Sequence, residues 1–112
     1  SETTLLKNNN LVLNIALNYS SKEEIINCFK ILKKKKLNFN KNNIGKYLFT
    51  SFSGDPDIVI RTGGYKRLSD FLLWQSSYSE LFFSKKLWPD FKANDLYNII
   101  KKFNLVRRNY GS

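Results

Sequence analysis

The chain of 112 residues has no histidine, no methionine and only one cysteine. Without histidine it lacks the usual zinc ligand sets, and a single thiol cannot form an internal disulfide. Cys28 shares a helical face with Ile25, Phe29 and Leu32, so we expect a buried structural thiol. A free thiol of this kind fits a reducing cytoplasm, where we expect the protein to be.

Acidic side chains are also scarce, with nine Asp and Glu against nineteen Lys and Arg and a net charge of +10. The lysines are scattered, and no RNP, zinc or other recognition motif accompanies them, so we do not expect nucleic-acid binding. The charge favours anionic diphosphates or an acidic bilayer surface. Because no apolar run approaches about 18 residues, we expect a chain that is soluble or in peripheral contact with a membrane.

Alternating helical and strand patterns dominate the rest of the sequence. Strands are predicted over 11–19, 58–60 and 81–83, an aromatic corner over 88–91, and helices over 21–36, around 44–48, over 68–77 and over 96–103. The first helix has the spacing of a capping box at Ser21 and Glu24. The βα(α)βαβα order predicts an α/β fold with a parallel sheet and flanking helices, and three strands would leave a sheet edge uncovered.

A cluster of polar residues follows the β-branched strand 58–60, which has the composition of a buried parallel strand. Arg61 comes at its end, Gly63 and Gly64 allow a turn, and Arg67 and Ser69 fall near the first turn of the predicted helix. Guanidinium groups beside a helix N-terminus at a carboxyl strand end would suit a phosphorylated ligand. The alternative is that the glycines only close a turn and the arginines are solvated.

Five linked motifs of this region resemble the carboxyl half of the cis-prenyltransferases, the undecaprenyl diphosphate synthase family. They are IRTGG, the step from Arg67 to Ser69, FLLWQ, the step from Tyr78 to Glu80, and LWPDF. The upstream LNIALNYSSKEEI is also similar to that family, so the resemblance extends from Leu11 to Gly111. It implies that residues 1–112 are the carboxyl-terminal part of a single domain.

The resemblance implies cis-prenyl chain elongation, in which isopentenyl diphosphate condenses with an allylic prenyl diphosphate to give a polyprenyl diphosphate. It implies substrate-binding roles for Arg61, Arg67 and Ser69, with Gly63, Gly64 and Arg108 as further candidates. Glu80 matches a carboxylate that contributes to a Mg²⁺ site, often across a homodimer. Hard oxygen ligands and substrate phosphates are what Mg²⁺ prefers.

Members of that family also carry an amino-terminal His-x-Met-Asp-Gly-Asn segment, whose aspartate handles the magnesium-bound allylic diphosphate. A chain without His or Met cannot contain it, so we expect a fragment, a split protein or a truncated gene product that needs an amino-terminal half. Two alternatives stay open: a non-catalytic partner subunit of a prenyltransferase, and a basic protein that binds nucleic acid or a membrane surface.

The sequence departs from the family pattern at four positions. Tyr65 and Lys66 stand where the family commonly has Glu and then His or a similar residue. Asp70 replaces an asparagine and brings a negative charge close to the predicted anion site. Asn109 replaces the arginine of an Arg-x-Gly ending, and Arg108 is the nearest substitute.

Overall fold

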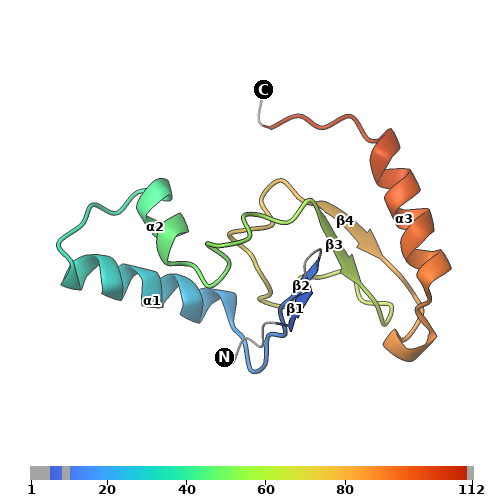
Figure 1. Cartoon of the computed structure of the whole chain (residues 1–112), viewed down its shortest axis with the longest axis horizontal. Coiled ribbons are helices and arrows are strands. Elements are labelled where there is room, and N and C mark those ends of the chain that lie inside the picture. Colours follow the sequence, from blue (N-terminus) through green and yellow to red (C-terminus); the bar gives the residue numbers. More distant parts are fainter. Residues whose placement is uncertain (1–5, 9–10, 111–112) are drawn as a thin grey trace. The chain divides into compact units, whose positions relative to one another are not determined.

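The computed structural model describes residues 6–8 and 11–110. The chain divides into two compact units, Ser1–Phe49 and Thr50–Ser112. In chain order the elements are β1 (Leu6–Asn8), β2 (Leu11–Leu13), α1 (Ser21–Lys34), α2 (Lys41–Tyr47), β3 (Ile58–Arg61), β4 (Glu80–Phe83), the 3₁₀ helix η1 (Trp88–Asp90) and α3 (Ala93–Leu105) (Figure 1). None of the helices in this described part combines the length and hydropathy that crossing a bilayer requires.

The first unit is built around α1 and α2. Among the described residues of this unit, four apolar side chains are buried: Cys28, Leu32, Ile44 and Leu48. The buried position predicted for Cys28 is confirmed. Burial raises the pKa of this thiol, and the negative charge of Glu24 raises it further.

The amino end of α1 is capped one residue earlier than the sequence pattern predicted. The hydroxyl of Ser20 accepts a hydrogen bond of 3.2 Å from the backbone N–H of Glu23. Glu24 is buried, with 2% of its surface exposed. Its carboxylate accepts hydrogen bonds from the hydroxyl of Tyr19 and, at 2.6 Å, from the backbone N–H of Phe49. The predicted capping box at Ser21 and Glu24 is therefore wrong, because Glu24 connects α1 to the segment that follows α2.

The carboxyl end of α1 is a Schellman turn. The N–H groups of Lys36 and Leu37 donate to the carbonyl groups of Lys33 (3.2 Å) and Leu32 (3.0 Å). Lys36 has a φ of +56°, so the helix ends at Lys34 and not at the predicted residue 36. A short loop then leads to α2, whose start is capped by the Asn40 side chain.

The strand predicted over 11–19 is mostly absent. Only β2 forms, and it pairs antiparallel with β1, with Leu6 opposite Leu13. Leu11, Ile15 and Leu17 are all exposed, so their alternation along the chain does not mark a buried face here.

In the second unit, β3 and β4 form a two-stranded parallel sheet, with Ile58 opposite Glu80 and Arg61 opposite Phe83 (Figure 1). This confirms the predicted α/β class with a parallel sheet, although the predicted first strand belongs to a separate hairpin. The burial predicted for the strand at 58–60 is wrong, and β4 is not buried either. All of β3 is only half-buried, and Leu81 is 42% exposed, because two strands present little surface to cover one another.

The helix predicted over 68–77 does not form. Residues 69–78 make successive turns and bends, and Ser69, Asp70 and Leu72 have φ values of +49°, +61° and +46°. Left-handed backbone at three nearly consecutive residues interrupts a right-handed helical ladder. The side chain of Gln75 is buried in this segment and donates to the hydroxyl of Thr50 at 3.2 Å.

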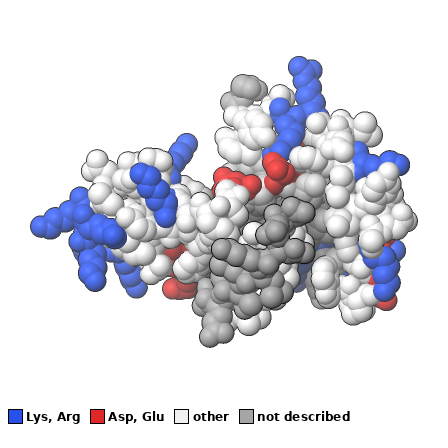
Figure 2. All heavy atoms as spheres, viewed as in Figure 1, with Lys and Arg blue, Asp and Glu red and all other residues white. Residues whose placement is uncertain are grey.

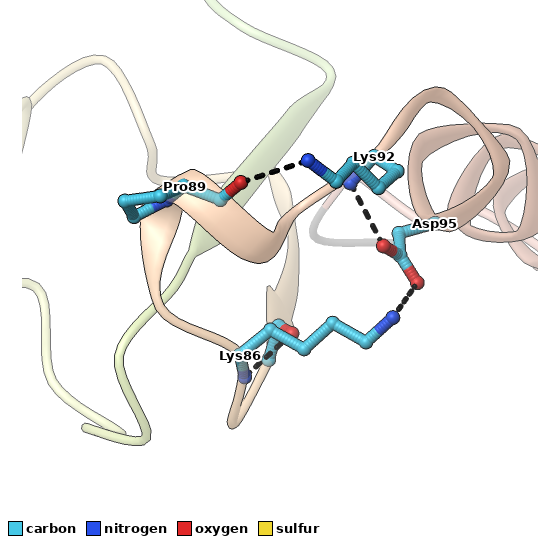
Figure 3. A network of polar contacts seen from close by, with 5 residues as sticks. Lys86, Pro89, Lys92 and Asp95 are labelled. Carbon is cyan, nitrogen blue, oxygen red and sulfur yellow. Dashed lines mark hydrogen bonds and ion pairs between the residues drawn. The ribbon is translucent and has the colours of Figure 1, made fainter.

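The aromatic corner and the final helix are present, and a polar network joins them (Figure 3). The Lys86 ammonium lies 2.8 Å from the Asp95 carboxylate, which also accepts the backbone N–H of Lys92 at 2.9 Å. The ammonium of Lys92 reaches back to the carbonyl of Pro89 at 3.0 Å. These contacts satisfy a free N–H at the start of α3 and fasten the helix to the loop after β4.

Candidate active site

Arg61 ends β3 and organises the turn that follows it. Its Nη1 donates to the backbone carbonyl of Arg67 at 3.0 Å and to the hydroxyl of Ser69 at 2.9 Å. A helix starting here would have used the Arg67 carbonyl for its own ladder, so this contact helps to explain the non-helical turn. The three residues predicted to bind substrate therefore lie together at the carboxyl end of β3.

The ring of Tyr65 lies beside both arginines. The guanidinium carbon of Arg67 is 4.5 Å from the ring centroid, and that of Arg61 is 5.5 Å from it. Attraction between a cation and the face of an aromatic ring holds such groups in place. Sequence reasoning treated Tyr65 only as a departure from the family pattern, although an aromatic residue between two arginines was a usable signal.

The two glycines fasten the turn to the segment after β4. Gly63 and Gly64 have φ values of +93° and +85°, which confirms that the turn needs their conformational freedom. Their N–H groups donate to the carbonyl groups of Lys86 (2.8 Å) and Ser84 (3.0 Å). In this conformation both N–H groups are already bonded to the protein, so the glycines shape the turn, and their predicted contact with substrate stays a prediction.

The charge of this site comes from side chains. Because the segment after Arg67 is not helical, the predicted contribution of a helix N-terminus is wrong. Residues 61–70 contain three cationic side chains, Arg61, Lys66 and Arg67, and one carboxylate, Asp70. Neither Arg61 nor Arg67 forms an ion pair with a carboxylate of the described residues, so the turn presents a positively charged surface.

Glu80 and Arg108 lie at the other edge of the sheet. Glu80 begins β4, and its N–H donates to the carbonyl of Asp57 at 2.9 Å. Arg108 is 2.7 Å from the Asp57 carboxylate and donates to the carbonyl of Tyr78 at 2.9 Å. The hydrogen bond to Asp57 is the main cause that raises the pKa of Arg108.

Both strands start at this amino edge, whereas Arg61 is at the end of β3. Three residue steps along a strand separate the edges by about 10 Å. Within one chain, the structure does not bring Glu80 or Arg108 into the cluster of Arg61, Arg67 and Ser69. Their predicted roles in metal and substrate binding stay predictions.

Glu80 is the carboxylate predicted to bind Mg²⁺. Among residues 6–8 and 11–110, no group of three or more His, Cys, Asp or Glu side chains is arranged to hold a metal ion. Mg²⁺ requires near-octahedral oxygen coordination, and Glu80 supplies one carboxylate. The described chain alone therefore does not fit a magnesium centre, and the other ligands would have to come from outside it.

Comparisons with known proteins agree on one family. The family model of undecaprenyl diphosphate synthases matches residues 1–111. An isoprenyl transferase of Wolinella succinogenes is 45% identical over 97 residues, which are 87% of this chain and 42% of that protein. An isoprenyl transferase of Fusobacterium nucleatum is 44% identical over 105 residues, 93% of this chain and 45% of the relative.

Solved structures give the same result. A probable undecaprenyl diphosphate synthase from Campylobacter jejuni matches with a TM-score of 0.78 and 38% identity, over 86% of this chain and 45% of that one. The second match is the structure of the lavandulyl diphosphate synthase of Lavandula x intermedia in complex with dimethylallyl diphosphate. It also has a TM-score of 0.78, with 28% sequence identity, and the match covers 86% of this chain and 44% of that chain. The chain thus spans less than half the length of these relatives, and the match covers roughly their carboxyl-terminal half.

Proposed function

The chain belongs to the undecaprenyl diphosphate synthase family, and from this membership we propose that it supplies the isopentenyl diphosphate-binding part of a cis-prenyl chain-elongating enzyme. One observation carries the proposal. Arg61 contacts both Arg67 and Ser69, and both guanidinium groups lie beside the ring of Tyr65. The residues expected to bind diphosphate are therefore neighbours on one turn.

Each member of this cluster has a distinct task in diphosphate binding. Arg67 is exposed, and its planar guanidinium can donate two parallel hydrogen bonds to phosphate oxygens. Arg61 uses Nη1 within the turn and keeps further N–H donors for a second phosphate oxygen. Tyr65 orients both cations, and the Ser69 hydroxyl can turn its proton toward the ligand.

The reaction that this binding serves is a head-to-tail condensation. The allylic carbon loses its diphosphate and forms a new carbon–carbon bond to isopentenyl diphosphate, which then loses a proton to give the cis double bond. The diphosphate of isopentenyl diphosphate stays intact throughout. The arginines would act by fixing that group, which positions the reacting double bond against the allylic carbon.

We propose that the allylic substrate is bound by protein outside these 112 residues, either an amino-terminal half or a second copy in a homodimer. Glu80 would be one of several oxygen ligands of Mg²⁺ in that complete site, where the ion would neutralise phosphate charge. Its position at the amino edge of the sheet leaves its backbone about 10 Å along the strands from the backbone of Arg61. A ligand set completed by another polypeptide accommodates that separation.

Reconstitution tests the proposal. The chain is combined with the amino-terminal half of the Wolinella succinogenes isoprenyl transferase, and incorporation of isopentenyl diphosphate into polyprenyl product is measured. We expect activity from the mixture, and we expect Arg67→Ala to lower kcat/KM for isopentenyl diphosphate roughly 10- to 100-fold, as for the loss of charged hydrogen bonds.

Arg107→Ala is the matched control, because Arg107 is an exposed arginine outside the cluster. It should leave kcat/KM within about twofold of the unaltered chain, as expected for a surface substitution. Equal effects of the two substitutions in an active mixture would refute the assignment of Arg67.

A further inference from the structure

A second cationic surface lies in the first unit, far along the sequence from the arginine cluster. Residues 29–47 contain seven lysines and no acidic residue. All seven are exposed: Lys30, Lys33, Lys34, Lys35, Lys36, Lys41 and Lys46. Figure 2 shows lysine and arginine side chains gathered over the end formed by α1 and the loop to α2, which we name the lysine surface.

Large apolar side chains are exposed among these lysines. Phe29, Leu37 and Phe39 are 38%, 42% and 58% exposed. The rings of Phe29 and Phe39 pack edge to face with their centroids 5.2 Å apart. The lysine surface therefore combines positive charge with exposed apolar side chains, whereas a merely solvated helix end needs only the charge.

The turn at the tip of this surface holds a lysine where glycine is the favoured residue. Lys36 occupies the left-handed position of the Schellman turn, with a φ of +56°. A residue with a Cβ costs about 1 kcal/mol there relative to glycine. The Schellman bonds of Lys36 and Leu37 fix the direction of the loop, so the charge is displayed on a defined backbone.

We propose that the lysine surface docks onto an anionic phospholipid bilayer, with the Phe29 and Phe39 rings inserted among the headgroups. Basic residues beside Phe and Leu are the composition of interfacial membrane-binding segments. Lysines near an anionic leaflet each add attraction that decays over a Debye length. Charge complementarity selects the occupant, because residues 29–47 offer seven cations and no anion.

Nucleic acid fits this surface less well. The segment contains no arginine, the residue whose planar fork reads phosphates and bases. Its two phenylalanine rings are packed edge to face on each other, whereas single-stranded nucleic acid is bound by aromatic faces open for base stacking. Binding to RNA is accordingly one of the outcomes that would overturn the proposal.

Flotation with lipid vesicles tests the proposal on the full 112-residue chain. The vesicles are phosphatidylcholine alone or with 30% phosphatidylglycerol, at low and at high salt. We expect the chain to float with the anionic vesicles at low salt only. We expect that binding to weaken between about 10- and 100-fold in the triple variant Lys33→Gln/Lys34→Gln/Lys36→Gln. Addition of Phe39→Ser to the triple variant should weaken vesicle binding several-fold more.

A triple variant with the same change in charge provides the control. Lys85→Gln/Lys101→Gln/Lys102→Gln removes three exposed lysines of the second unit and should change binding less than about threefold, by long-range attraction alone. Lys36→Gly distinguishes loss of charge from loss of the fold, because it removes one charge and makes the turn more stable. This variant should bind anionic vesicles several-fold more weakly than the unaltered chain, although it should unfold at a higher urea concentration.

Three results would overturn the proposal. The first is equal loss of binding in the two triple variants, which would show dependence on net charge alone. The second is equal binding to neutral and anionic vesicles. The third is tighter binding to a uridine oligonucleotide than to vesicles, with the same dependence on Lys33, Lys34 and Lys36.

Discussion

Arg108 and Asp57, 51 residues apart in the sequence, form an ion pair of 2.7 Å at the amino edge of the parallel sheet. Arg108 also lies over the rings of Phe103 and Tyr110, which are 5.2 and 5.0 Å away. These contacts hold the segment after α3 against the start of β3. In this conformation the guanidinium is engaged by its own chain, so diphosphate binding by Arg108 would require it to leave Asp57.

Asp57→Asn should release this segment, because it removes the charge that Arg108 pairs with. We expect trypsin to cleave after Arg108 several-fold faster in the variant, since cleavage requires local opening. Mass spectrometry of timed digests measures the rate. Asp55→Asn, at an exposed position two residues earlier, should cleave at the original rate, and the same acceleration there would argue against the ion pair as the cause.

Gly64→Ala should destabilise the second unit by about 1 kcal/mol, because φ at this residue is +85° and a Cβ is strained there. No heavy atom lies within 4 Å of the added Cβ, so the cost is one of backbone conformation. Urea unfolding gives the free energy. Gly45→Ala, inside α2 and equally unobstructed, should instead stabilise by about 0.5–1 kcal/mol.

Acid should weaken the attachment of α3. The pKa of Asp95 is lowered, first by the hydrogen bond from Lys86 and then by the N–H of Lys92. A carboxylate with a lower pKa in the folded chain stabilises the fold above its usual pKa near 3.8, and this contribution is lost as the pH falls through the folded value.

Urea unfolding of the unaltered chain and of Asp95→Asn at several pH values checks this linkage. The two should differ in stability at pH 7, and the difference should shrink as the pH falls through the lowered pKa of Asp95, where the carboxylate becomes protonated. Asp90→Asn, in η1, serves as the matched control. A constant difference between Asp95→Asn and the unaltered chain across this range would show that protonation of Asp95 plays no part.

Cys28 should react slowly with thiol reagents. Its side chain is fully buried, and burial raises the pKa of the thiol, so thiolate is scarce at neutral pH. We expect labelling by a chromogenic disulfide at pH 8 to be at least about 100-fold slower in buffer than in concentrated urea. Similar rates in both solvents would mean that the packing of α1 on α2 opens freely.

The parallel strands and the arginine turn were predictable from the sequence because their signals are local. The run from Ile58 to Ile60 is short and β-branched, and its composition suits a parallel strand. Arg61 follows at the carboxyl end, where ligands of such sheets bind. The contacts among Arg61, Arg67 and Ser69 then follow from one short turn.

The segment after the turn could not be predicted from periodicity. Leu68, Phe71 and Leu72 have helical spacing, but the Arg67 carbonyl and the Ser69 hydroxyl are used by Arg61. This contact from a residue outside the segment accompanies left-handed backbone at Ser69, Asp70 and Leu72, which a helix does not contain. Spacing also gave the wrong capping residue for α1, because Ser20 and Ser21 each precede a glutamate by three residues.

The position of Glu80 at the amino edge of the sheet could be predicted from the sequence, although the motif resemblance assigned it to the same substrate site as Arg61. A residue that precedes a parallel strand lies at the amino edge of the sheet, and one that ends a strand lies at the carboxyl edge. Glu80 and Arg61 are therefore separated within one chain. The exposure of Leu11 and Ile15 was not predictable, because periodicity shows which face is apolar but not what covers it.

Direct binding of isopentenyl diphosphate tests the central claim. Titration calorimetry of the 112-residue chain should give a dissociation constant that Arg67→Ala raises roughly 10- to 100-fold, and Arg67→Lys should restore part of the loss because it keeps the charge without the fork. An unchanged dissociation constant in Arg67→Ala would contradict the account and remove the arginine turn from the diphosphate site.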